Sequence, residues 1–270
     1  MTMLPPWHPH FDVWAAVLVL GVGYWYANTR LRRILAPGSL GPRRRQWWQW
    51  YLALALIWLV SDWPLHEIGE SQLFTVHMVE HMTLSLVVPP LLLMATPRWL
   101  AEVTLGRRGV ARWLRPLAHP VVAFTLFNAV FILIHWPDLL EVMVSSDLAH
   151  LLVHGLLFFS ALLMWMPVLS PTPAIPKLRR PMQMLYLFFQ SLLPTIPASF
   201  LTFSSVPIYP VYGEAAMAWG LSAVADQTIA GIVMKLGGGF LIWATIAVIW
   251  FRWTSEERRW EDLETSVSAT

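Results

Sequence analysis

The sequence contains no cysteine among its 270 residues. This absence excludes disulfide bonds, thiolate zinc sites and cysteine-based copper motifs, and leaves histidine, methionine and carboxylate side chains as metal ligands. Charged residues are also scarce: they make up 13% of the chain, whereas soluble domains carry about 25%. Because 57% of the residues are hydrophobic and the mean hydropathy is +0.55, the composition predicts an integral membrane protein.

Long apolar stretches recur along the whole chain. At about 20 residues per crossing, we predict an all-α, polytopic bundle of seven transmembrane helices that forms a single domain over residues 1–253 and is followed by a polar cytoplasmic tail, 254–270. No basic residue precedes the first stretch, so we expect it to remain as a helix and not to be cleaved as a signal. The predicted helices lie at about 11–29, 46–62, 73–95, 119–136, 148–168, 183–204 and 226–251.

The basic residues fall on one side of this predicted bundle. Of the 18 lysines and arginines, 17 follow the first, third, fifth or seventh stretch, and the exception is Lys235, inside the last stretch. By the positive-inside rule that side is cytoplasmic and the N-terminus lies outside. The isoelectric point near 9.2 therefore indicates topology and contact with anionic membrane lipids, and does not indicate nucleic-acid binding.

Two histidine pairs have the same spacing within apolar stretches: His77 with His81, and His150 with His154. Residues four apart share one face of a helix, with Cβ atoms about 5–6 Å from each other, so each pair can direct two imidazoles at one point. The second pair lies 73 positions after the first. Two helices that face each other would supply four nitrogen ligands, which predicts a metal site.

The offset of 73 residues also aligns two Trp-Pro pairs in the outer turns, and places Asp62 opposite His135. The fourth and fifth helices are therefore predicted to repeat the second and third as a parallel hairpin, which would bring both histidine pairs to one depth in the outer half of the membrane. A further shift of 73 brings His154 to Gln227, next to Asp226. This is consistent with a third, weaker copy in the last two helices.

Other polar residues are candidates for completing the site. We expect His135, Asp62 and Asp226 to complete or tune the coordination of the metal. Carboxylates often hold a ligating histidine from the outer shell, and the candidates for that shell are Glu80, Asp147, Gln227 and Lys235. The expected partner of Lys235 is Glu80 or a backbone carbonyl of a broken helix. His8, His10 and His66 lie in outer segments, where solvation is more typical than metal binding, and transient capture of a cation is the alternative role.

Several short motifs together resemble one family: His77-Met-Val-Glu-His81, Val88-Pro-Pro-Leu-Leu92, Trp165-Met-Pro167, Tyr209-Pro210, and Ala225-Asp-Gln-Thr-Ile-Ala-Gly231 leading to Met234. The chain resembles the CtaG-type assembly factors of bacterial caa-type cytochrome c oxidases, a seven-helix membrane family. The resemblance covers the chain from Asp12 to about Trp253. Lys235 and Glu80 depart from the family's pattern, and both add charge near the expected site.

The resemblance implies a role in assembling the oxidase in the bacterial cytoplasmic membrane, by supplying or placing copper from the outer side. Its implied partners are the oxidase subunits and a soluble copper chaperone on that side. We therefore predict a carrier of Cu(I) or Cu(II), not an enzyme, because imidazole suits both oxidation states. Two alternatives stay open: a membrane zinc hydrolase with a metal-bound water, and a b-type haem electron carrier with one axial histidine from each helix.

Overall fold

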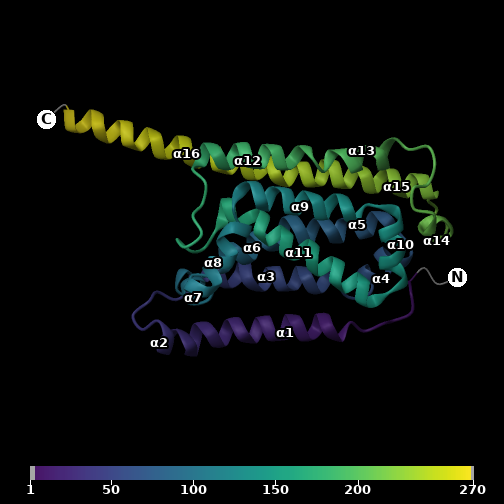
Figure 1. The fold of residues 1–270 in the computed structure, drawn as a ribbon, viewed down its shortest axis with the longest axis horizontal. Coiled ribbons are helices and arrows are strands. Elements are labelled where there is room, and N and C mark those ends of the chain that lie inside the picture. Colours follow the sequence, from purple (N-terminus) through teal and green to yellow (C-terminus); the bar gives the residue numbers. More distant parts are fainter. Residues whose placement is uncertain (1–3, 269–270) are drawn as a thin grey trace.

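The computed structural model describes residues 4–268, apart from the side chains of residues 141, 144, 145, 147 and 260–268. Within this part of the chain all secondary structure is helical, so the predicted all-α class is confirmed. The long helices lie roughly along one axis (Figure 1). The first described residues lie at one end of this axis, and the last helix, α16 (Gly238–Ser268), extends beyond the other.

The helices differ widely in length. The longer ones are α1 (Phe11–Tyr26), α3 (Arg44–Val60), α9 (Pro120–Ile134), α11 (Asp147–Leu169), α12 (Arg180–Leu192) and α16. The shorter ones are α2 (Arg32–Leu35), α4 (Leu65–Ser71), α5 (Phe74–Met82), α6 (Val88–Ala95), α7 (Arg98–Thr104), α8 (Arg108–Leu117), α10 (Pro137–Ser145), α13 (Thr195–Phe203), α14 (Gly213–Ala218) and α15 (Ala223–Ile232). The π-helical turns η1 (Ala27–Leu31), η2 (Thr83–Val87) and η4 (Val233–Gly237) join successive α-helices, and η3 (Pro210–Tyr212) is a 3-10 turn.

Four helical segments are long and apolar enough to cross a membrane: Phe74–Ala95, Leu148–Leu169, Arg180–Phe203 and Ala223–Arg259. A fifth is obtained if α8 and α9, which are bent by 67°, count as one span. The predicted spans 11–29 and 46–62 are not among them. α3 has only 17 residues, fewer than a crossing usually needs, and α1 continues through η1 into a polar, arginine-containing segment. The structure thus indicates a multi-pass membrane protein with four or five candidate spans, and the count of seven stays a prediction.

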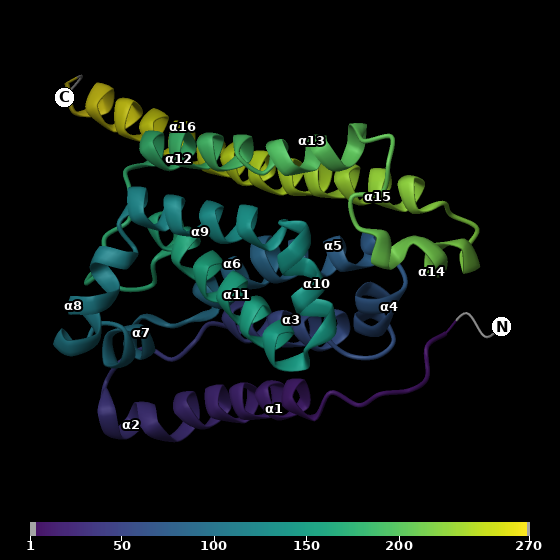
Figure 2. The ribbon, with the colours of Figure 1, turned by 45° about the vertical axis from the view of Figure 1, so that its right-hand side comes forward.

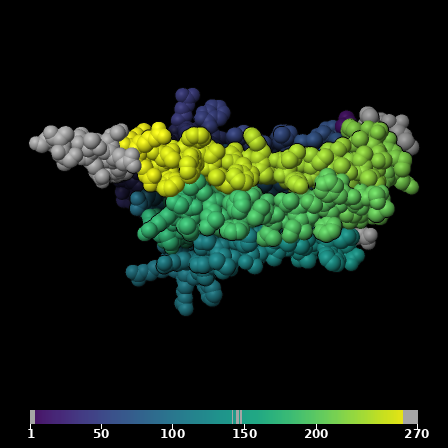
Figure 3. Space-filling view, turned by 90° about the horizontal axis from the view of Figure 1, so that it is seen from above, coloured from purple at the N-terminus to yellow at the C-terminus, as the bar shows by residue number. Residues whose placement is uncertain are grey.

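The helices pack in two layers. In the first, α3 lies between α1 and α6, and α11 lies between α6 and α9. In the second, α12 packs on α16 and α13 on α15, while α15 also contacts α5 (Figures 2 and 3). The common core contains large side chains from both layers, each at most 1% exposed, such as Phe74, Phe131, Leu157 and Met234. This core holds the short helix α5 in the middle of the bundle.

Proline separates α5 from the rest of its span. Pro89 and Pro90 have no amide hydrogen to donate to the preceding turn of the helix. The wide turn η2 precedes them and keeps the chain helical from α5 into α6. Short helices α4, α10 and α14 gather at the end of the bundle where the first described residues lie (Figure 1). Of the three, α4 packs directly on α5.

Candidate metal centre

The start of α5 is fixed by Asp226 from α15. Its carboxylate accepts hydrogen bonds from the backbone amides of Phe74, at 2.7 Å, and Thr75, at 3.1 Å. The first amides of a helix have no partner within that helix, so an acceptor at this point determines where the helix begins. His77 and His81 then follow one turn apart on the same side of α5.

The start of α11 is capped in a similar way. The hydroxyl oxygen of Ser146 accepts a hydrogen bond from the backbone amide of Ala149. His150 and His154 occupy the first two turns that follow, again with one face in common. Local capping therefore places each histidine pair near a helix start at the same end of the bundle.

The four histidines meet in one place, here called the inner cluster: His77, His81, His150 and His154. The Nε2 atom of His154 lies 3.1 Å from Nε2 of His81 and 2.8 Å from Nε2 of His150. The ring centroid of His77 lies 4.1 Å from that of His81 and 5.9 Å from that of His154. The structure thus brings all four predicted ligands together, from two helices.

The inner cluster is suited to a cation because several of its ring nitrogens have no hydrogen-bond partner among the described residues. Both ring nitrogens of His77 and Nδ1 of His81 are buried and have no hydrogen-bond partner among the described residues. Burying a polar atom without a partner is costly, and an ion between the rings would remove that cost. Nitrogens of His77, His81 and His154 all lie within 4.8 Å of one another. Metal–nitrogen bonds of about 2.0–2.1 Å in a tetrahedron need nitrogens about 3.3 Å apart, so binding requires only small side-chain adjustments.

A carboxylate lies beside Nδ1 of each imidazole of α11, at hydrogen-bond distance for His150 and at ion-pair distance for His154. Oε1 of Glu70 lies 2.9 Å from Nδ1 of His150, and Oε1 of Glu80 lies 3.6 Å from Nδ1 of His154. A carboxylate at Nδ1 favours the tautomer with its hydrogen there, which leaves the Nε2 lone pair free for a metal. Both Nε2 atoms point into the inner cluster. Glu80, expected as an outer-shell residue, therefore lies beside the site, and Glu70 lies there as well.

His66 of α4 lies against the same two carboxylates. Its Nδ1 is 3.1 Å from both oxygens of Glu80, and its Nε2 is 3.8 Å from Oε2 of Glu70. Burial disfavours the charged imidazolium, but the hydrogen bond and charge of Glu80, with the charges of Glu70 and Glu67, outweigh it and raise the pKa of His66 to about 9. These carboxylates thus favour the protonated form of His66 in the metal-free protein.

Three residues proposed from the sequence to complete the coordination do not belong to the group of His77, His81 and His154 whose nitrogens lie within 4.8 Å of one another. The carboxylate of Asp62 accepts a hydrogen bond from Nε1 of Trp14 at 2.7 Å. Nδ1 of His135 lies 2.6 Å from the carbonyl oxygen of Phe131, and its buried Nε2 has no partner among the described atoms. Both oxygens of Asp226 are occupied by the amides at the start of α5.

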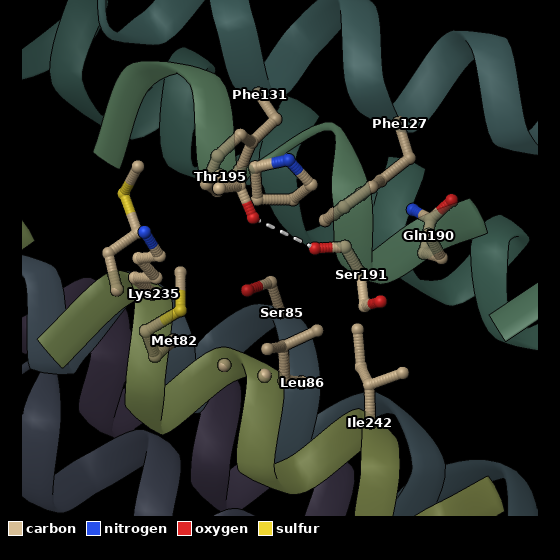
Figure 4. Close-up of a pocket in the computed structure, with 14 residues that line it drawn as sticks. Met82, Ser85, Leu86, Phe127, Phe131, Gln190, Ser191, Thr195, Lys235 and Ile242 are labelled. Atoms are coloured by element: carbon tan, nitrogen blue, oxygen red, sulfur yellow. Dashed lines mark hydrogen bonds between the residues drawn. The ribbon is translucent and has the colours of Figure 1, made fainter. Parts of the chain in front are cut away.

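Gln227 and Lys235, two further outer-shell candidates, make contacts other than with the inner cluster. The side chain of Gln227 ties down the 201–208 segment, accepting from the amide of Ile208 and donating to the carbonyls of Leu201 and Val206. The side chain of Asp147 lies outside the described residues. Lys235 lines a small pocket with Met82, Ser85 and Thr195 (Figure 4). The described residues give it no hydrogen bond or ion pair, and Glu80, its expected partner, instead contacts Ser61 and His66.

His66 and Glu70 were not predicted as residues of the site. They are four residues apart, the spacing of the two histidine pairs, so one face of a short helix presents both. That spacing was available from the sequence. The sequence does not show that α4 folds back onto α5. In the structure Gly69 lies so close to the backbone of His77 that a Cβ atom added to Gly69 would lie 3.1 Å from the backbone nitrogen of His77.

Comparison with known proteins gives a family match over most of the chain. The family described as cytochrome c oxidase caa3 assembly factor (Caa3_CtaG) matches residues 22–256. Uncharacterized proteins of Mycobacterium bovis and Mycobacterium tuberculosis are each 28% identical over 95% of this chain, and one of Mycobacterium leprae is 26% identical over 92%. The chain spans 40% of the length of these relatives. No solved structure matches it.

Proposed function

The chain belongs to the cytochrome c oxidase caa3 assembly factor (Caa3_CtaG) family, and we propose that it carries copper for the assembly of such an oxidase. The copper would be bound by the inner cluster and passed on to an oxidase subunit. The protein would act as a carrier and not as an enzyme. The observation that carries this proposal is the meeting of four imidazoles in the inner cluster. Both ring nitrogens of His77 and Nδ1 of His81 are buried there without a hydrogen-bond partner among the described residues.

Copper fits this donor set better than other cations do. Imidazole binds both Cu(I) and Cu(II), and divalent copper binds nitrogen sites more tightly than its first-row neighbours. Hard cations such as Mg²⁺ and Ca²⁺ prefer oxygen ligands. The chain has no cysteine, so the metal is not held by thiolates, and neutral imidazoles favour release to a partner.

The proposed setting is the bacterial cytoplasmic membrane, crossed seven times with the inner cluster towards the outside. α1, α3 and α9 run beside the four candidate spans (Figure 1), which supports counting them as crossings. Residues 1–253 would form one domain, and the end of α16 would project into the cytoplasm as the predicted tail. The 73-residue offset between His81 and His154, whose rings are in contact, supports the proposed parallel repeat of hairpins.

The proposed partners follow from this orientation. A soluble copper chaperone on the outer side would deliver the metal, and oxidase subunits in the same membrane would receive it. Anionic lipids would contact the arginines at the cytoplasmic ends of the helices. A b-type haem is less favoured, because the rings of His81 and His154 touch and leave no space for a porphyrin between them. A zinc hydrolase would use the same histidines, and metal analysis separates it from a copper carrier.

The test is the metal content of the purified protein after growth with copper. We expect copper in the wild type, its loss in His81→Ala/His154→Ala, and no loss in His119→Ala, which removes an exposed histidine outside the cluster. Retention of copper with all four cluster histidines changed to alanine contradicts the proposal. In cells, deletion should lower oxidase activity while the subunits are still made, and normal activity at limiting copper would argue against the role.

A further inference from the structure

We propose that a cation reaches the inner cluster along two further groups of ligands that lead in from the surface. The outer group consists of His8, His10 and Glu67, and the middle group of His66, Glu70 and His150. In each group, one possible ligand atom from every residue lies within 4.8 Å of the others. This inference rests on the proposed function, because it supplies the route to the site where copper would be held.

The outer group is held in place by the fold, although its histidines precede the first helix. Glu67 of α4 lies 3.4 Å from Nδ1 of His8 and 3.2 Å from Nε2 of His10, through the same oxygen. Nε1 of Trp63 donates to the carbonyl oxygen of Pro5, and Nε1 of Trp14 donates to Asp62. These bonds tie the chain on both sides of His8 and His10 to the corner that contains α4. The two histidines are therefore positioned over Glu67.

The middle group connects the outer group to the inner cluster. The ring of His66 lies 4.7 Å from that of His10 on one side and 5.0 Å from that of His150 on the other. His150 belongs to both the middle group and the inner cluster: its Nδ1 faces Glu70 and its Nε2 faces His154. A cation can thus exchange one ligand at a time, and each new ligand is already in contact with the previous one.

Exposure falls between the entrance and the inner cluster, although not at every ligand, since the side chain of Glu70 is 21% exposed and that of His154 12%. The side chain of His8 is 66% exposed, that of His10 15%, and that of His150 7%, whereas His81 is 1% exposed. An exposed first ligand can capture a hydrated ion, and each later ligand replaces part of its water. The route therefore removes the hydration shell in steps, which avoids the large cost of burying a bare charge at once.

The donor chemistry also changes along the route. The outer and middle groups each combine two imidazoles with one carboxylate, whereas the inner cluster contains imidazoles only. Carboxylates attract and partly neutralise a cation near the surface, and nitrogen ligands then favour copper over harder cations. The carboxylates of Glu67, Glu70 and Glu80 follow the route from the outer group to the inner cluster. The predicted outer segments contain no lysine or arginine to oppose them.

The first test measures how fast the full-length protein takes up Cu(II) after rapid mixing with copper chloride. Loss of the capturing imidazoles beside Glu67 should slow uptake in His8→Ala/His10→Ala by about tenfold or more, with unchanged final copper per protein. Control variants His119→Ala and Glu214→Gln, an exposed histidine and an exposed acid outside the route, should load at the wild-type rate. An unchanged rate in His8→Ala/His10→Ala overturns the route.

The second test removes the inner cluster and asks whether the route still binds metal. In His77→Ala/His81→Ala/His154→Ala, added Cu(II) should give an electron paramagnetic resonance signal with mixed nitrogen and oxygen ligands. Adding His8→Ala/His10→Ala should weaken that signal, because only the middle group then remains, and adding His66→Ala as well should remove it. An unchanged signal in the first step overturns the outer group. If wild type and the triple variant bind the same amount of copper with the same signal, the proposed function itself fails. If the inner cluster loads but entrance variants do not slow it, only the route fails.

Discussion

The Nε2 atoms of His81 and His154 lie 3.1 Å apart, although 73 residues separate them in the chain. One histidine comes from α5 and the other from α11, so their contact joins two separate hairpins at the buried end of the site. Neutral imidazole has one lone pair, so in a hydrogen bond across this contact one Nε2 donates and the other accepts, whereas with a metal between the rings both Nε2 lone pairs would be directed at the ion. An ion at this point would be held by both helices at once.

The contact predicts that the two histidines act as a pair. Changing either to alanine should lower copper affinity by more than the 10- to 100-fold typical of an outer-shell partner, because each removes a direct ligand. The double variant should lose little more than one single variant, since the remaining ring alone cannot complete the site. Competition with a copper chelator measures this, and additive losses would show that the rings bind metal independently.

Glu80 is predicted to tune the metal and not to bind it. Glu80→Gln keeps the size of the side chain and a hydrogen-bond acceptor for Ser61, but removes the charge beside His66 and His154. We expect copper affinity to fall by about 10- to 100-fold with one metal site retained. Asp62→Asn, at a buried acid paired with Trp14, should leave the affinity unchanged. Complete loss of copper from Glu80→Gln would show that Glu80 binds the metal directly.

Asp226 is predicted to stabilise the fold without binding metal. In Asp226→Ala the amides of Phe74 and Thr75 lose their acceptor, and a buried unsatisfied amide costs about 1–3 kcal/mol. We expect a lower free energy of unfolding and a lower melting temperature, while copper per folded protein stays the same. Asp226→Asn retains one acceptor oxygen and should lose less stability. Loss of copper at unchanged stability would instead support the ligand role suggested by the sequence.

The comparison of His81 with Asp226 shows what sequence could and could not provide. The histidine pairs were identifiable because helical periodicity is local: four residues apart means one face, whatever the rest of the chain does. The role of Asp226 depends on a contact with Phe74 across 152 residues, and no local pattern contains that information. Similarly, all-α structure followed from composition, whereas short helices such as α4 at the end of the bundle depend on how the chain folds back.

Lys235 is predicted to be dispensable for metal binding. It lines a pocket that includes none of the four cluster histidines, next to Met82 and Thr195 (Figure 4), and a lysine at the centre of a membrane helix costs about 2.5–3.5 kcal/mol on insertion scales. Lys235→Met has a similar length without the charge. We expect unchanged copper content and equal or higher thermal stability in detergent. Reduced copper content in this variant would connect the pocket to the metal site.

Gly69 is predicted to set the distance between α4 and the inner cluster. A Cβ atom at this position would lie 3.1 Å from the nitrogen and 3.2 Å from the Cα atom of His77, closer than ordinary van der Waals contact, and both are backbone atoms of a packed helix. Gly69→Ala should therefore displace α4 from α5 and move Glu70 away from His150. We expect weaker copper binding and a lower melting temperature.

Gly155 supplies the matched control for this change, because it directly follows His154 in α11 and a Cβ atom there would have no neighbour within 4 Å. Gly155→Ala adds a methyl group to the interior of a helix, where alanine is more favourable than glycine by up to about 1 kcal/mol. It should thus keep copper affinity and slightly raise the melting temperature. Equal effects of Gly69→Ala and Gly155→Ala on copper affinity would mean that the approach of α4 to His77 does not hold the site together. Loss of affinity in Gly69→Ala alone would show that this helix contact positions the carboxylates that orient His150 and His154.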